Sequence, residues 1–175
     1  MKIECSVKKN VLHVIFPQSY GDTWNKKHSQ FLKDQLHPED IYDNPELCKD
    51  VLQVSKRYEG ENRFVGFNFP ASYIRKSEIS LYPYKNKVRY VIAYMKGDTH
   101  TIEHEKRHAL FYLDKHYRTS VKRSWKKLER SNPKRHKSIL KKLKKDGYKK
   151  EVFIDEFQAY YPNLIEITPR LEPNS

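Results

Sequence analysis

Two histidines and a glutamate within residues 104–108 form the pattern in this chain that most directly indicates chemistry. The segment reads His-Glu-Lys-Arg-His, so His104 and His108 are four positions apart and Glu105 directly follows the first of them. On an α-helix, residues four apart lie on one face, so both imidazoles can reach one tetrahedral metal ion. Glu105 would then stay beside a water molecule on that metal. The pattern predicts a Zn²⁺ site with a general base next to it.

A catalytic zinc needs a third protein ligand, and Glu156 is the candidate. We expect it on a last helix, from about residue 149 to 161. Its neighbours three and four positions away are apolar or aromatic: Val152, Phe153, Ala159 and Tyr160. A carboxylate on such a face must be paired, hydrogen-bonded or metal-bound. We favour metal ligation over a salt bridge to Lys106 or Arg107, because Glu156 and the two histidines explain each other.

Two other residues are alternative third ligands. Asp114 would serve in a metzincin-type arrangement, but Phe111 stands where that arrangement requires Gly. Six residues of helical rotation would also carry Asp114 away from the histidine face. His100, one turn before His104, could extend the row of histidines, although the start of a helix is the simpler place for it. Glu156 therefore ranks first.

The 104–108 segment and the later Asp-Glu-Phe-Gln-Ala-Tyr stretch at 155–160 together resemble the gluzincin class of zinc metallopeptidases. The resemblance covers about sixty residues. It implies that His104, His108 and Glu156 bind zinc and that Glu105 is the general base. It also implies an edge strand, just before the motif helix, that binds the substrate backbone. Residues 88–94 occupy that position in the sequence.

Charge in the middle of the motif departs from this class. Lys106 and Arg107 stand at positions that are usually uncharged, so we expect them to face solvent or acids such as Asp155. Asp155 is also a candidate to orient a ligand imidazole. Tyr160 or Tyr161 could stabilise an oxyanion, although a plain core role is the simpler interpretation of Tyr160.

Positive charge is concentrated between the two proposed ligand-bearing helices. The chain has a net charge of +13, and residues 115–150 contain 16 Lys and Arg against two acids. Such density attracts nucleic acid or another polyanion, although a solvated helical face is the alternative. The candidate contacts are Lys126, Lys127, Lys141, Lys142, Lys144 and Lys145. No established nucleic-acid-binding signature accompanies them.

The chain length of 175 residues suits a single domain with a substantial core. We expect a strand-rich part (1–97) with two helices, a helical part with the metal site (98–167) and a frayed tail (168–175). The two cysteines are too few for a disulfide framework, which favours a reducing compartment. No apolar run has the length of a membrane span or a signal peptide. We therefore expect a soluble intracellular protein, in the cytoplasm, nucleus or nucleoid.

Hydrophobic periodicity predicts an α+β fold, in which a small, mostly antiparallel sheet with a hairpin packs on helices. Strands are expected at 11–16, 64–69, 79–83 and 87–94, the last two forming the hairpin. Helices are expected at 22–36, 44–58 and 99–117, followed by two basic helices divided at 132–133 and the last helix. Residues Ile102, Ala109 and Leu113 should turn the motif helix toward the sheet.

The leading hypothesis is a zinc-dependent metallopeptidase-like hydrolase that acts on peptides or proteins and is recruited to a polyanion. Two alternatives stay open. One is a non-enzymatic, basic nucleic-acid-binding protein in which the histidine motif is accidental. The other is a catalytically inactive domain that binds zinc.

Overall fold

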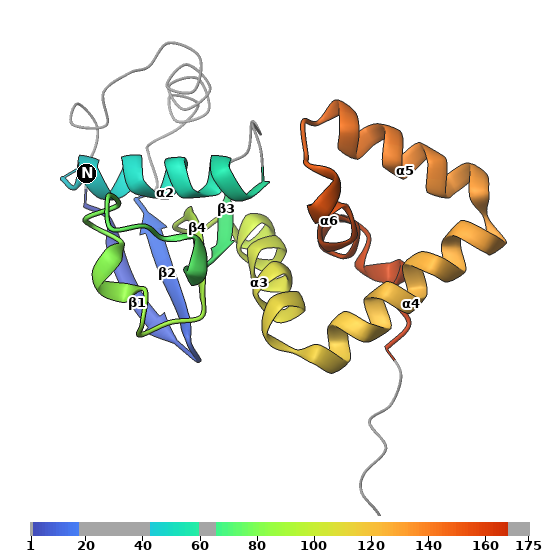
Figure 1. The fold of residues 1–175 in the computed structure, drawn as a ribbon, viewed down its shortest axis with the longest axis horizontal. Helices are drawn as coiled ribbons and strands as arrows, with labels where there is room; N and C mark the ends of the chain where they lie inside the picture. The colour runs from blue at the N-terminus through green and yellow to red at the C-terminus, as the bar shows by residue number, and fades with distance from the viewer. Residues whose placement is uncertain (1, 18–42, 60–65, 168–175) are drawn as a thin grey trace, which may run out of the picture.

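A computed structural model describes residues 2–17, 43–59 and 66–167 of this chain (Figure 1). The fold is α+β, with a four-stranded sheet in the N-terminal half and helices in the C-terminal half, as predicted. The helix expected at 22–36 lies outside the described residues, as do positions 64 and 65 of the second expected strand.

The sheet is mixed, with the strand order β1-β2-β4-β3. Its strands are β1 (Glu4–Lys8), β2 (Val11–Phe16), β3 (Phe67–Pro70) and β4 (Tyr90–Met95). β1 and β2 form an antiparallel hairpin, β2 runs parallel to β4, and β4 runs antiparallel to β3. Lys9 and Asn10 close the hairpin with φ angles of 47° and 65°, the positive values that suit a tight two-residue turn.

The hairpin predicted at residues 79–94 was wrong. Only 90–95 is a strand, and the chain before it forms consecutive turns with a 3-10 helix at Tyr82–Tyr84. Backbone hydrogen bonds such as Tyr84 N to Leu81 O (2.9 Å) satisfy the chain locally. Ile79 is 77% exposed, so this segment has no apolar face to bury in a sheet. The hairpin of this fold is instead the one formed by β1 and β2.

The expected substrate-binding edge strand was also misplaced. β4 pairs with β2 on one side and with β3 on the other, so its backbone has no open edge. Among the described residues, β3 is the edge strand at that end of the sheet. The chain passes from β4 through Gly97, with φ at 86°, into the next helix.

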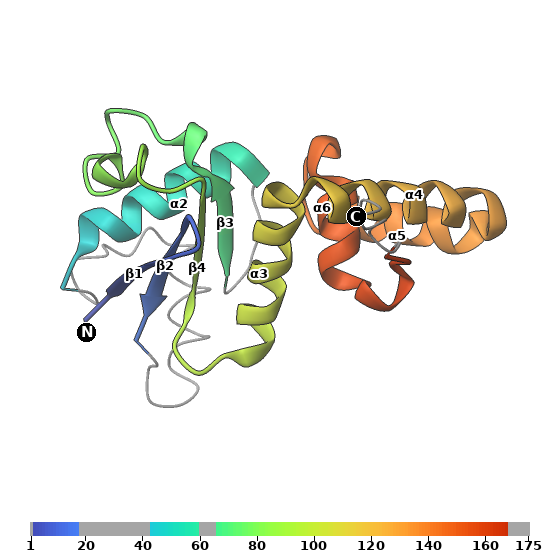
Figure 2. The ribbon, with the colours of Figure 1, turned by 90° about the horizontal axis from the view of Figure 1, so that it is seen from below.

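Helices cover both faces of the sheet. α2 (Pro45–Glu59) packs on the face that includes Leu12 and Val14, whereas α3 (Thr99–Leu113) packs on the face that includes Val11 and Ile92. As predicted, α3 turns Ile102, Ala109 and Leu113 toward the sheet. Figures 1 and 2 show α3 between the sheet and the remaining helices, so α3 belongs to both halves of the molecule.

The helical half consists of α4 (Lys115–Ser131), α5 (Pro133–Lys145) and α6 (Phe153–Tyr160), with short 3-10 turns at 150–152 and 162–164. α3 ends four residues before its predicted end because Asp114 stops it and caps α4, accepting hydrogen bonds from the backbone N–H groups of His116 and Tyr117. Aromatic residues dominate the core here, with Trp125 packed against Phe157. Within the described ranges, no helix is both long and apolar enough to span a membrane.

A buried ion pair ties α2 to the turns that follow β3. The Glu78 carboxylate accepts hydrogen bonds from Arg57 Nη2 (2.5 Å) and from the Arg75 backbone N–H. Burial opposes ionisation of Glu78, but these bonds and the two positive charges outweigh it and hold the pKa of Glu78 below 4.5. Ionised Glu78 therefore stabilises the fold above pH 4.5, and this contribution is lost as the pH falls through the lowered pKa.

We predict that Glu78→Gln lowers the free energy of unfolding at pH 7 by about 2–3 kcal/mol, because it removes charged hydrogen bonds. Urea unfolding should also show a smaller loss of stability between about pH 5 and pH 3 than in the wild type. Glu46→Gln is the control, since the Glu46 side chain is 69% exposed in its pair with Lys49. Equal stability of the two variants at pH 7 would contradict the prediction.

Candidate metal centre

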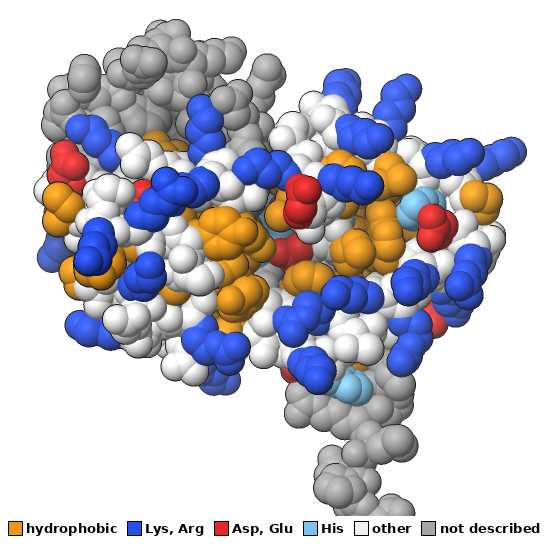
Figure 3. Space-filling model, viewed as in Figure 1, with side chains coloured by type: hydrophobic (Ala, Val, Ile, Leu, Met, Phe, Trp, Pro, Cys, Tyr) orange, Lys and Arg blue, Asp and Glu red, His pale blue; other side chains and the backbone are white. Residues whose placement is uncertain are grey.

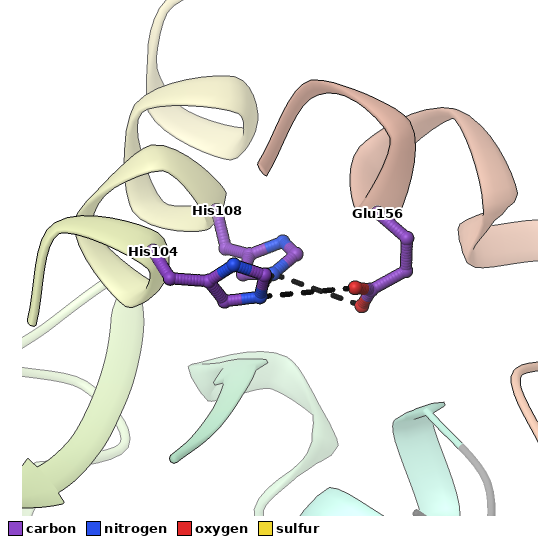
Figure 4. Close-up of side chains that lie close together, drawn as sticks. All are labelled: His104, His108 and Glu156. Atoms are coloured by element: carbon purple, nitrogen blue, oxygen red, sulfur yellow. Dashed lines mark hydrogen bonds and ion pairs between the residues drawn. The ribbon is translucent and has the colours of Figure 1, made fainter. Parts of the chain in front are cut away.

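The structure brings His104 and His108 on α3 together with Glu156 on α6, as Figure 4 shows. The Nε2 atoms of the two histidines are 3.1 Å apart. Glu156 Oε1 is 3.7 Å from His108 Nε2, and Glu156 Oε2 is 3.9 Å from His104 Nε2. His108 and Glu156 are buried, and the His104 side chain is 13% exposed. This group could hold a metal ion.

The donor set and its spacing fit a tetrahedral ion. Ligand atoms about 2.0–2.1 Å from a zinc ion lie roughly 3.4 Å from one another, close to the three distances observed. Glu156 Oε2 is buried and has no hydrogen-bond partner among the described residues. An orphaned buried carboxylate oxygen carries a large desolvation cost, which a cation between it and the imidazoles would offset.

Asp155 orients one of the two imidazoles. Its Oδ1 accepts a hydrogen bond from His108 Nδ1 (2.8 Å), which places the ring proton on Nδ1 and leaves the Nε2 lone pair facing His104. The same oxygen accepts from Gln158 Nε2 (3.0 Å), and Gln158 Oε1 accepts from the Tyr117 hydroxyl (2.9 Å). The chain of buried bonds therefore links the ligand set to the first turn of α4.

Burial and mutual charge shift the pKa values of the cluster. Burial, with positive charge from His108 and Arg107, lowers the pKa of His104 to about 3, so this imidazole is neutral. Burial alone would lower the pKa of His108, but the Asp155 and Glu156 carboxylates outweigh it and raise that pKa. Burial raises the pKa of Glu156 to about 8. The cluster therefore favours positive charge at its centre.

Glu105 is buried at 3% exposure and is held from the sheet side. Its Oε2 accepts a hydrogen bond from Asn68 Nδ2 (3.0 Å), and Asn68 Oδ1 accepts from the Tyr90 hydroxyl (2.6 Å). Gly66 packs so closely that an added Cβ would overlap Glu105 Oε1 and Thr101 Cγ2. Burial raises the pKa of Glu105 to about 7. The start of β3 therefore fixes the position of this carboxylate.

A cavity of about 180 Å³ joins these groups. Its wall includes Gly66, Asn68, His100, Thr101, His104, Glu105, His108, Tyr148, Glu156 and Tyr160. The Tyr160 ring lies 4.5 Å from the His104 ring, and its hydroxyl is 2.9 Å from that of Tyr148. Tyr161 does not line the cavity and instead stacks on Phe157. Of the two tyrosines named from the sequence, only Tyr160 can reach a molecule bound there.

The charged residues inside the motif point away from the imidazoles. Lys106 pairs with the exposed Glu103 (2.9 Å), and Arg107 Nη1 donates to the Ala159 carbonyl oxygen (3.4 Å). Neither forms the salt bridge to Glu156 that was the alternative to metal ligation. Asp114 is engaged in capping α4, and the exposed His100 lines the cavity without joining the ligand group.

Sequence reasoning missed Gly66, Asn68, Thr101 and Tyr148 as residues of this cavity. Thr101 could have been found, because it lies one turn before Glu105 on the same helix. The others come from distant segments, and no local pattern marks them. Tyr148 reaches the cavity because Gly147, with φ at 88°, redirects the chain after α5.

Comparisons of this chain with protein-family models, with curated proteins and with solved structures find no match. The site defines an α+β protein with a buried His-His-Glu group that could hold a metal ion. Every functional argument below therefore starts from the geometry of this site.

We predict about one divalent metal ion per chain in protein purified without chelators or a histidine tag, measured by elemental analysis. His108→Ala and Glu156→Gln should each weaken metal binding by more than the roughly 10- to 100-fold expected for loss of an outer partner. His100→Ala is the matched control, one turn from His104 on the same helix. Loss of metal from this control would contradict the proposed ligand set.

We predict that Asp155→Asn weakens metal binding by about 10- to 100-fold, because the amide no longer fixes the tautomer and basicity of His108. Competition with a chromophoric chelator measures the change. Asp146→Asn, which alters a half-buried aspartate that pairs with Lys142 (2.5 Å), is the control. Unchanged affinity in Asp155→Asn would show that the His108–Asp155 hydrogen bond does not tune the site.

Proposed function

We propose that this chain is a zinc-dependent hydrolase that cleaves peptide bonds. Zn²⁺ would be held by His104, His108 and Glu156, with Glu105 as the general base. The observation that carries the proposal is that Glu105 lines the same cavity as all three ligand side chains. A structural histidine cluster has no need of a further carboxylate directed into that cavity.

The residues around the cavity divide the chemistry of hydrolysis between them. Zn²⁺ supplies a Lewis acid that polarises the scissile carbonyl group and acidifies water. Glu105 takes a proton from the attacking water and delivers it to the leaving amine. Asp155 keeps the imidazole of His108 in its ligand orientation. The Tyr160 hydroxyl is placed to donate a hydrogen bond to the developing oxyanion.

We further propose that the substrate lies along β3. This strand ends the sheet among the described residues, and Gly66 and Asn68, at its start, line the cavity. An extended peptide can pair with an edge strand through backbone hydrogen bonds, which orients it without regard to its sequence. Pro70 cannot donate such a bond, so pairing is confined to the part of β3 nearest the cavity.

A catalytically inactive zinc-binding domain is the second candidate function. It is favoured by the burial of Glu105, whose Oε2 already accepts a hydrogen bond from Asn68. The cavity of about 180 Å³ is also smaller than the roughly 300–1,000 Å³ usual for ligand pockets. In this case Zn²⁺ would join α3 to α6 and have no chemical role.

We predict that Glu105→Gln retains zinc but lowers hydrolysis by at least about 100-fold, since the amide cannot accept the proton. Elemental analysis measures the zinc, and labelled casein with a library of quenched fluorescent peptides measures cleavage. Glu103→Gln is the matched control, because this glutamate is exposed on the same helix. Hydrolysis by Glu105→Gln at the wild-type rate would refute Glu105 as the base. Zinc binding without any cleavage by the wild type would favour the inactive domain.

A further inference from the structure

The outer face of α4 carries a continuous row of exposed cationic side chains. Lys122, Arg123, Lys126, Lys127 and Arg130, with Thr119 and Ser131 at the ends, line a second hollow of about 620 Å³. We name these five cations the α4 stripe. It lies outside the metal cavity and shares no residue with it.

The stripe is straight because its members recur every three or four residues, which keeps them on one side of the helix. With a rise of 1.5 Å per residue, residues 119–131 span about 18 Å. The opposite side of α4 carries Val121 and Trp125, which are buried in the helical core. The helix therefore divides into an apolar side that fixes it in the fold and a cationic side that faces solvent.

Little within the described residues neutralises this charge. α4 contains seven Lys and Arg and a single acid, Glu129. Lys127 pairs with Glu166 (2.6 Å), but both side chains are more than half exposed, so the pair contributes little. α5 adds further exposed lysines, and Lys and Arg side chains surround a patch of hydrophobic side chains on the helical half in Figure 3. The net charge of the segment thus remains available to an anionic partner.

The chemistry of the surface favours one class of polyanion. No large hydrophobic side chain of α4 or α5 is exposed, so neither helix offers an apolar anchor for a membrane. Tyr117 and Trp125 are buried and cannot stack on the bases of a single strand. A straight row of cations without apolar or aromatic contacts matches the regular phosphates of a duplex.

We propose that the α4 stripe binds the phosphate backbone of double-stranded nucleic acid without reading its sequence. The proposal is independent of the metal site and holds whether or not that site is catalytic. It narrows the set of lysines expected from the sequence, because it assigns the contact to α4 and gives Lys141, Lys144 and Lys145 on α5 no required part.

The test compares two triple charge reversals of equal net charge in the full chain. One is K122E/K126E/R130E on α4, and the control is K134E/K137E/K141E on α5, where all three lysines are exposed. Fluorescence anisotropy measures binding to a 20-base-pair DNA duplex, the same RNA duplex, a single strand and vesicles with phosphatidylserine. Circular dichroism, the melting temperature and zinc content report whether each variant is folded.

The wild type should bind duplex with an affinity whose logarithm falls linearly with the logarithm of the salt concentration. The α4 reversal should weaken binding by about 100-fold or more and reduce the salt slope by about three phosphate contacts, whereas the α5 reversal should cost less than about fivefold. K122Q/K126Q/R130Q, which adds no acid, should show a smaller loss in the same direction. Equal losses in the α4 and α5 reversals, or tighter binding to single strands or vesicles, would overturn the proposal.

Discussion

The burial of three carboxylates beside two imidazoles is the constraint on which the helical half depends. Glu105, Asp155 and Glu156 are each at most 5% exposed, and an isolated buried carboxylate is strongly unfavourable. Asp155 is compensated by His108 and Gln158, and Glu105 by Asn68. Glu156 Oε2 is left without a hydrogen bond among the described residues. A cation between α3 and α6 would complete this compensation, so the electrostatics of folding and the proposed chemistry make the same demand.

The sequence predicted most successfully what depends on local spacing. Asn44 and Pro45 marked the start of α2, and Asn132 and Pro133 marked the break between α4 and α5. The spacing of the two histidines placed both on one face of α3. The apolar neighbours of Glu156 indicated that its carboxylate would be buried, although they did not identify what lies opposite. That pairing followed only from the requirement for a third ligand.

What the sequence did not predict depends on which segments meet in space. A run such as 79–83 has the composition of a strand, but no partner strand or apolar layer receives it, and turns take its place. The parallel pairing of β2 with β4 joins segments more than seventy residues apart, so β4 lies in the interior and not at the edge. Asn68 and Tyr148 reach the cavity from such distant segments. Local periodicity carries no information about these long-range contacts.

The basic helices are also a structural requirement of the metal centre. α3 and α6 lie against each other only because α4 and α5 turn the chain back, and the bond between Gln158 and Tyr117 fixes α6 against the first turn of α4. An ion bound by His108 and Glu156 would close this loop of nearly fifty residues, and closing a long loop restricts the unfolded chain. Metal binding would therefore stabilise α4 together with the site, because one side of that helix packs on the ligand-bearing helix. The opposite side then keeps its cations in a fixed row, which a mobile basic segment could not do.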